Sequence, residues 1–332
     1  MDLDAYIAEH DGEWRRLAQL SRRRRLTAPE ADELMMLYQR SSTQLSMVRS
    51  RMPDPLLVAR LSGLVLHARS TVTGGRTASA RDFVRFFTHM FPAAVYGARR
   101  WWAAVAAVFV LVSALIMSYI ASNPEVQSEL ASPDEIAFLV DYSFEQYYSE
   151  FQNQNFALQV WTNNARLSAL ALVGGALLVP TLWVLWSNAI GLSVVGGLMI
   201  GNGRADLYFL LIAPHGLLEI SSFLLASAIG LRLGWSWIAP PENLTRGQSL
   251  AKAGRVGIVA ALGLVAVFAV AGLIEGFVTP NLPAFAAVPI GVLAFGGFVA
   301  YVVVRGRAAV AEGYTGDLQA DMREADLPGA TR

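Results

Sequence analysis

His215 and Glu219 place an imidazole and a carboxylate in a stretch that is otherwise apolar, LLIAPHGLLEISSFLLASAIGLRLG over residues 210–234. The two residues are four positions apart, so in a helix they lie on the same face, one turn from each other. Ser222 continues that face at the next turn. Side chains of these types can ligate a metal, exchange protons, bind a polar ligand or complete a buried hydrogen-bond network.

Other polar residues stand at the ends of neighbouring apolar runs. Asn163, Asn164 and Arg166 precede one run, and Glu275 closes another. If the chain crosses a membrane six times, these residues belong to three spans and meet His215 and Glu219 in the outer half of the membrane. We therefore predict a polar intramembrane cluster with seven members: Asn163, Asn164, Arg166, His215, Glu219, Ser222 and Glu275.

Three uses of this cluster remain open. The favoured one is structural, with Arg166 paired to Glu219 or Glu275, because charged groups in lipid need partners. The second is a pocket for a polar ligand such as a lipid-linked sugar or a peptide. The third is catalysis with His215, Glu219 and Glu275 as metal ligands, but a single H-x-x-x-E is a weak zinc pattern. We assign no catalytic residue, no metal and no cofactor.

The composition predicts an all-α, polytopic membrane protein. Hydrophobic residues make up 54% of the 332 residues and charged residues 16%, well below the roughly 25% of soluble proteins. Runs of about 20 apolar residues predict membrane-spanning helices. The predicted spans are 101–121, 207–233, 256–274 and 285–304, together with a run at 167–200 that is long enough to form a hairpin of two, broken near Pro180 or Ser187–Asn188.

The distribution of charge predicts the orientation of the chain. Residues 1–100 are rich in arginine, whereas residues 122–165 hold acidic residues and neither lysine nor arginine. Cytoplasmic loops of membrane proteins carry the excess of basic residues. We therefore expect six spans in the cytoplasmic membrane of a bacterium, with both termini in the cytoplasm.

Three regions follow from these spans. Residues 1–100 form a cytoplasmic helical domain, whose run Arg22–Arg25 is interpreted as a solvated loop that can contact lipid headgroups; we expect no nucleic-acid partner. Residues 101–304 form the transmembrane domain, with residues 122–165 as a helical outer loop, and residues 305–332 form a disordered tail. Small residues allow close packing of membrane helices, which is the expected role of Gly174, Gly175, Gly196, Gly197, Gly216 and Gly230.

Three motifs in this order make the chain resemble the stage II sporulation protein M family of bacterial integral membrane proteins. Pro214, His215, Gly216, Glu219 and Gly230 match its Pro-His-Gly pattern with a following glutamate and a glycine-terminated span. Asn163, Asn164 and Arg166 match its Asn-Asn-x-Arg opening, and GLIEGFVTP, with Glu275, matches its Ile-Glu-x-Phe ending. The N-terminal region resembles the long form of the family, which often has aspartate where this chain has Gln44.

The resemblance implies a scaffold for cell-envelope remodelling that works with peptidoglycan-cleaving partners or a membrane-associated ATPase system. Membrane lipids are expected contacts, and the glycine-rich spans permit a homo-oligomer. We lean towards a protein that is not itself an enzyme. The alternative is an intramembrane metal-dependent hydrolase or a transporter built around His215 and Glu219.

Overall fold

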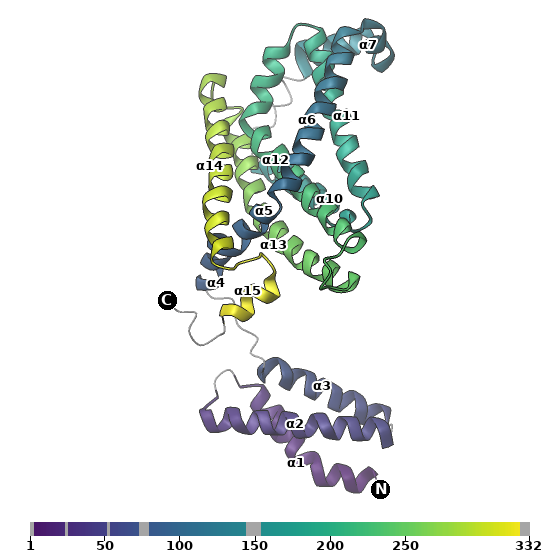
Figure 1. Ribbon diagram of the computed structural model, residues 1–332, viewed down its shortest axis with the longest axis vertical. Helices are drawn as coiled ribbons and strands as arrows, with labels where there is room; N and C mark the ends of the chain where they lie inside the picture. The colour runs from purple at the N-terminus through teal and green to yellow at the C-terminus, as the bar shows by residue number, and fades with distance from the viewer. Residues whose placement is uncertain (1–2, 24–25, 52–53, 73–79, 144–153, 326–332) are drawn as a thin grey trace. The chain divides into compact units, whose positions relative to one another are not determined.

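The computed structural model describes residues 3–23, 26–51, 54–72, 80–143 and 154–325 (Figure 1). All regular structure in these ranges is helical, which confirms the predicted all-α class. The chain divides into two compact units, residues 1–80 and 81–332, each with its own packed interior.

Three helices form the N-terminal unit: α1 (Leu3–Ser21), α2 (Ala28–Arg51) and α3 (Pro55–Val72). Prolines 29 and 55 stand at the starts of α2 and α3, where the missing backbone N–H costs nothing. The fully buried side chains of Trp14, Leu17 and Leu61 lie in the interior of the unit. The helical structure of this region agrees with the prediction from the sequence.

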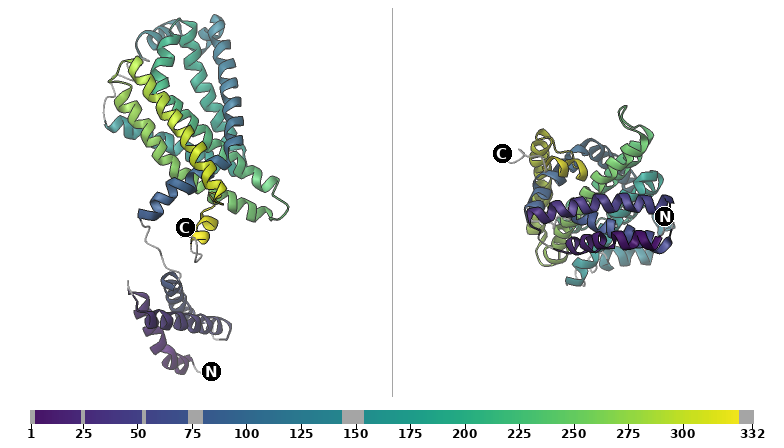
Figure 2. Two further views of the ribbon diagram at one scale, coloured as in Figure 1. Left: turned by 60° about the vertical axis from the view of Figure 1, so that its left-hand side comes forward. Right: turned by 90° about the horizontal axis from the view of Figure 1, so that it is seen from below.

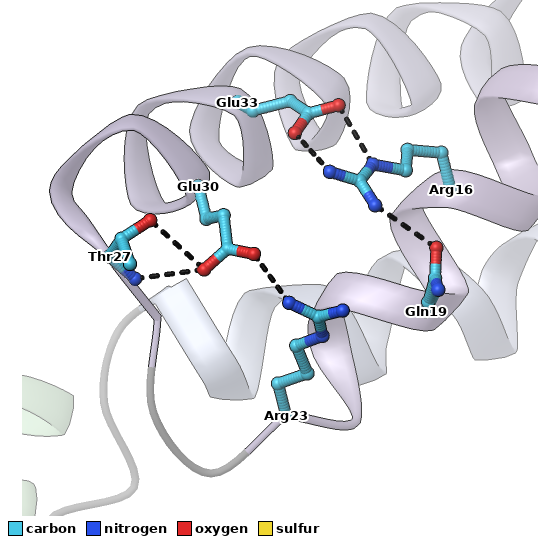
Figure 3. A network of polar contacts seen from close by, with 6 residues as sticks. All are labelled: Arg16, Gln19, Arg23, Thr27, Glu30 and Glu33. Atoms are coloured by element: carbon cyan, nitrogen blue, oxygen red, sulfur yellow. Dashed lines mark hydrogen bonds and ion pairs between the residues drawn. The ribbon is translucent and has the colours of Figure 1, made fainter.

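Ion pairs fasten α1 to α2 across the outside of the unit (Figure 3). Arg16 donates from Nε and Nη2 to the two oxygens of Glu33, at 2.9 and 2.7 Å. Arg23 pairs with Glu30, whose carboxylate also accepts from the Thr27 backbone. The hydrogen bond from Arg16 lowers the pKa of Glu33. One member of the basic run Arg22–Arg25 is therefore engaged within the unit, while residues 24 and 25 lie outside the described ranges.

The second unit contains the membrane helices. Five segments in the described part of the chain are long and apolar enough to cross a membrane. They are α6 (Arg99–Ser122), α11 (Val179–Gly201), α12 (Ala205–Ile238), α13 (Arg246–Leu273) with a π-helical extension at Ile274–Val278, and α14 (Ala284–Ala311). Large apolar side chains on these helices, such as Phe285 and Leu293, point outwards and are mostly exposed, as lipid-facing residues must be.

The predicted hairpin at 167–200 differs in detail from the structure. The first leg is α10 (Gln154–Gly174), which starts earlier than expected and is not among the five apolar segments. The bend lies at Gly175–Leu178, where Leu178 adopts a left-handed φ of 64°. Ser187 and Asn188 lie inside α11 and do not break it. The polar residues near the start of α10 lower its mean hydropathy but do not interrupt the helix. For this reason α10 begins before the apolar run and is not among the five apolar segments.

Contacts between the helices fix their directions. Trp161 Nε1 on α10 donates to the carbonyl of Val265 on α13 at 3.0 Å, and Leu172 lies beside Gly257, so the two helices are antiparallel. Helix α6 is parallel to α11, with Ser193 Oγ donating to Ser113 O. Seen from two sides, α6 and α11 run along one flank of the bundle and α14 along another (Figures 1 and 2). Together with the α12–α13 hairpin, the six helices alternate between the same two ends.

Short helices complete the unit at both ends. Helices α7 (Pro124–Leu130) and α8 (Pro133–Phe138), followed by the π-helical turn Leu139–Ser143, follow α6. Helices α4 (Ala80–Arg85) and α5 (Phe91–Gly97), joined by the π-helical turn Phe86–Met90, precede α6. The sequence placed residues 81–100 in the first domain, but they belong to the second unit because α5 packs on α13 and α14.

The predicted disorder of residues 305–332 is wrong as far as Ala325. Helix α14 continues to Ala311, and α15 (Leu318–Ala325) folds back onto the unit. Arg255 donates from Nε and Nη2 to Asp317 at 2.6 and 2.8 Å. These hydrogen bonds lower the pKa of Asp317. The polar composition of the tail led to the prediction of disorder, because the sequence does not show that Arg255 lies close enough to pair with Asp317.

Glycines create the closest approaches between helices. A Cβ at Gly175 would lie 2.0 Å from the carbonyl carbon of Gly230, and one at Gly234 would lie 2.2 Å from the oxygen of Gly175. Gly196 and Gly197 contact α6 in the same manner, through Met117 and Ile120. A Cβ at Gly174, the last residue of α10, would lie 2.9 Å from Pro180 at the start of α11. Gly216 differs, because a Cβ there would meet Ile212 of its own helix.

A side chain at Gly230 should therefore separate α12 from the bend after α10. We expect Gly230→Val to cost about 1–3 kcal/mol or more through overpacking, and so to lower the melting temperature of the detergent-solubilised protein by several degrees. Gly297→Val is the control, since no atom lies within 4 Å of a Cβ at Gly297. Equal melting temperatures for the two variants would contradict the packing described here.

Candidate functional site

The membrane unit contains a partly open cavity of about 680 Å³. Its walls come from α6, α10, α11, α12 and α13 with its π-helical extension. Nine of the lining residues are polar or ionisable, an unusual number for a space between apolar helices: Gln159, Asn163, Asn164, Ser168, Ser187, Asn188, His215, Glu219 and Glu275. Ionisable groups at such depth usually face a wet cavity or a protein interior.

His215 enters this cavity from α12. Pro214 and Gly216 flank it, and all three residues are buried. The Nε2 atom of His215 lies 3.9 Å from Oε1 of Glu275, and its Nδ1 atom lies 3.4 Å from the Thr279 hydroxyl. The first distance is too long for a hydrogen bond but close enough for electrostatic attraction when the imidazole is protonated.

Glu275 lies in the π-helical extension of α13. π-Helical turns often occur at functional sites. The Glu275 side chain is 6% exposed, and its Oε2 atom has no hydrogen-bond partner among the described residues. Glu219 on α12 likewise has an unpartnered buried Oε2, although Asn164 lies within hydrogen-bonding reach of this residue. The two carboxyl groups are close enough to interact with each other.

Most of the residues predicted for the cluster come together in the structure. Asn163, Asn164, His215, Glu219 and Glu275 all line the cavity. Ser222 is buried on α12 but does not line it.

Arg166 does not join the other predicted residues, and the described lining of the cavity therefore lacks the positive charge expected beside its two glutamates. It is exposed, it does not line the cavity, and no ion pair joins it to Glu219 or Glu275 in the described part of the chain. The expected pairing is therefore wrong. Arg166 lies just beyond the edge of the face of α10 that lines the cavity: it is three positions from Asn163 but two from both Asn164 and Ser168, a spacing at which side chains point in different directions.

Sequence reasoning missed four lining residues, Gln159, Ser168, Ser187 and Asn188. A signal existed for two of them, because Ser187–Asn188 is a polar pair within an apolar run. It was interpreted as a break in the helix, whereas the structure keeps the helix and brings Asn188 to the cavity. Gln159 lies before the apolar part of α10, where the sequence predicted an interfacial loop.

In the described residues no group of three or more His, Asp or Glu side chains is placed to hold a metal ion. The three metal-ligand candidates from the sequence, His215, Glu219 and Glu275, all line the same cavity. What the arrangement can do is accept hydrogen bonds at two carboxylates and offer amides around them.

Two family models match the chain. One is described as stage II sporulation protein M and matches residues 104–280, just over half of the chain and nearly all the helices that line the cavity. The other is a domain of unknown function and matches residues 4–74, which correspond to the N-terminal unit. No curated protein and no solved structure matches.

Glu219→Gln should leave the melting temperature unchanged or raise it by a few degrees. The amide keeps the contact with Asn164 and removes the repulsion from Glu275, and about 1 kcal/mol corresponds to roughly 2–4 °C for a domain of this size. Asp206→Asn, an exposed change on the same helix, is the control and should have no effect. A fall of several degrees for Glu219→Gln alone would show that the carboxylate has a partner that stabilises the fold.

Proposed function

This chain belongs to the stage II sporulation protein M family, and on that premise we propose that it is an integral membrane scaffold for cell-envelope remodelling. Its partners are other envelope proteins, either peptidoglycan hydrolases or a membrane-associated ATPase system. Its role is to hold them at the membrane, alone or as a homo-oligomer, and not to catalyse a reaction itself.

The observation that carries this proposal is the separate N-terminal unit. It has its own core, and a chain of hydrogen bonds runs through it: Trp14 Nε1 donates to Gln44 Oε1 at 2.7 Å, and Gln44 Nε2 donates to Glu13 Oε2 at 3.0 Å. Gln44 is therefore part of the core of the unit. A unit that has its own core can present a surface to partners without disturbing the membrane helices of the same chain.

The N-terminal unit also offers apolar side chains at its surface. Leu56 and Leu66 on α3 are 82% and 65% exposed, and Met35 and Met36 on α2 are nearly half exposed. Large apolar side chains on a small soluble unit are typical of interaction surfaces. They support a docking role for α2 and α3.

We further propose that the chain lies in the bacterial cytoplasmic membrane with both termini in the cytoplasm. Arginine and lysine residues gather at the end of the bundle where α6 and α13 begin and α14 ends, whereas the opposite end carries the acidic residues of α7 and α8. Arg204 is an exception at that acidic end, where it lies 3.6 Å from Asp141. This distribution agrees with the positive-inside rule.

Cysteine labelling tests this orientation, because the natural chain has no cysteine. In intact cells, Ser128→Cys on α7 should react with a membrane-impermeant thiol reagent. Gly247→Cys at the start of α13 is also exposed but should react only after the cells are opened. Labelling of Gly247→Cys in intact cells would contradict the orientation.

A second candidate function is the binding or transport of a small ligand within the membrane. The cavity favours it, because Ser187 and Asn188 extend the polar lining beyond His215 and Glu219. The arrangement of the ionisable side chains gives less support to a metal-dependent hydrolase. Ligand binding is compatible with a scaffold, whose assembly a ligand can regulate.

The scaffold predicts direct partners at α3. A photo-crosslinking amino acid at Leu56 or Leu66 in the full-length protein in cells should give adducts with peptidoglycan-cleaving or ATPase proteins. The control position is Phe285 on α14, whose side chain is 82% exposed, as that of Leu56 is, but which should crosslink to lipid. The proposal is wrong if α3 gives only self-adducts or the same adducts as Phe285.

A further inference from the structure

Two hydrogen-bond acceptors in the cavity are left without donors. The Oε2 atoms of Glu219 and Glu275 are buried and unpartnered in the described part of the chain, and the Glu275 side chain is 94% buried. A buried polar atom without a partner destabilises the fold. A molecule that brings N–H donors into the cavity removes this destabilisation at both residues.

The charged residues that line the cavity favour a ligand with a positive charge. Among the residues that the structure describes, no lysine or arginine lines the cavity, and Arg166, the nearest candidate in sequence, is exposed outside it. The imidazole of His215 already faces Glu275 at 3.9 Å. Anionic ligands such as phosphates or carboxylates would meet two carboxyl groups with no opposing cation, whereas a cation would be attracted.

We propose that the cavity binds the ammonium group of an organic amine between Glu219 and Glu275. An ammonium group has three N–H donors and no acceptor, which matches carboxylates that only accept. A cation placed between the two carboxyl groups also replaces their mutual repulsion with attraction. This inference concerns the cavity alone and does not depend on the scaffold proposed above.

The rest of the lining fits an organic molecule better than a bare metal ion. The described residues contain no group of ligands suited to a metal. Amides at Gln159, Asn163 and Asn188 can hydrogen-bond polar substituents, and Phe223 and Phe268 can contact a carbon chain. The volume of about 680 Å³ lies within the roughly 300–1,000 Å³ of small-molecule sites.

Three small probes of matched size test the charge preference. The full-length protein in lipid nanodiscs is titrated with butylammonium chloride, sodium butyrate or 1-butanol at constant ionic strength, and the melting temperature is followed. Butylammonium should raise it in a saturable manner, because a ligand that binds only the folded state stabilises that state. Butyrate and butanol should not.

Two kinds of variant locate the binding. Glu275→Gln removes one carboxylate and should weaken the apparent affinity for butylammonium at least tenfold, while Asp206→Asn, on the surface of α12, should not change it. Gly191→Leu keeps both carboxylates but fills the cavity, since Gly191 lines it and a Cβ there meets no atom within 4 Å. It should weaken binding similarly, whereas Gly297→Leu, which is equally free of contacts but outside the cavity, should not.

The proposal fails if butylammonium stabilises the protein no more than butanol or butyrate does. It also fails if Gly191→Leu binds butylammonium as well as Gly297→Leu does. If Glu275→Gln does not fold, the comparison of Gly191→Leu with Gly297→Leu still tests the proposal, because both variants retain the two glutamates. The crosslinks predicted from α3 are measured separately, so either proposal can fail without the other.

Discussion

Carboxyl groups on membrane helices cannot be left in contact with lipid, and this constraint shapes the second unit. Glu219 and Glu275 lie on α12 and on the extension of α13, the two helices with the most buried spans. An ionised or hydrogen-bonding group in hydrocarbon costs several kcal/mol. The bundle encloses both groups by placing α10, the least apolar of its long helices, across them with Asn163 and Asn164 turned to the cavity.

Close contacts between backbones hold α10 beside α12. Gly175, Gly230 and Gly234, none of which lines the cavity, allow the turn after α10 to approach α12. Nearer the start of α12, Pro214 interrupts the regular hydrogen bonding, and its carbonyl packs against Gly291 of α14. His215 follows directly, so the residues that position α12 against its neighbours also position the imidazole. The small residues and the polar cluster are thus two parts of one arrangement.

Much of this arrangement could be predicted from the sequence. Composition and the length of the apolar runs predicted the all-α class and the positions of most spans. The convergence of Asn163, Asn164, His215, Glu219 and Glu275 followed from their depth along alternating spans. Depth does not give the direction in which a side chain points, and for that reason Arg166 was wrongly included. Hydropathy also cannot separate a polar residue that ends a helix from one that lines a cavity, as Asn188 does.

The central claim is that the interior of the membrane unit holds an accessible cavity that prefers cations. Asn188→Cys introduces a single thiol there, since the natural chain has no cysteine. Its rate of modification should be measured with a cationic and an anionic methanethiosulfonate, with Ser193→Cys, a fully buried position on the same helix, as the unreactive control. The account predicts faster reaction with the cationic reagent and loss of that preference in Glu275→Gln. No reaction at Asn188→Cys, or faster reaction with the anionic reagent, would contradict it.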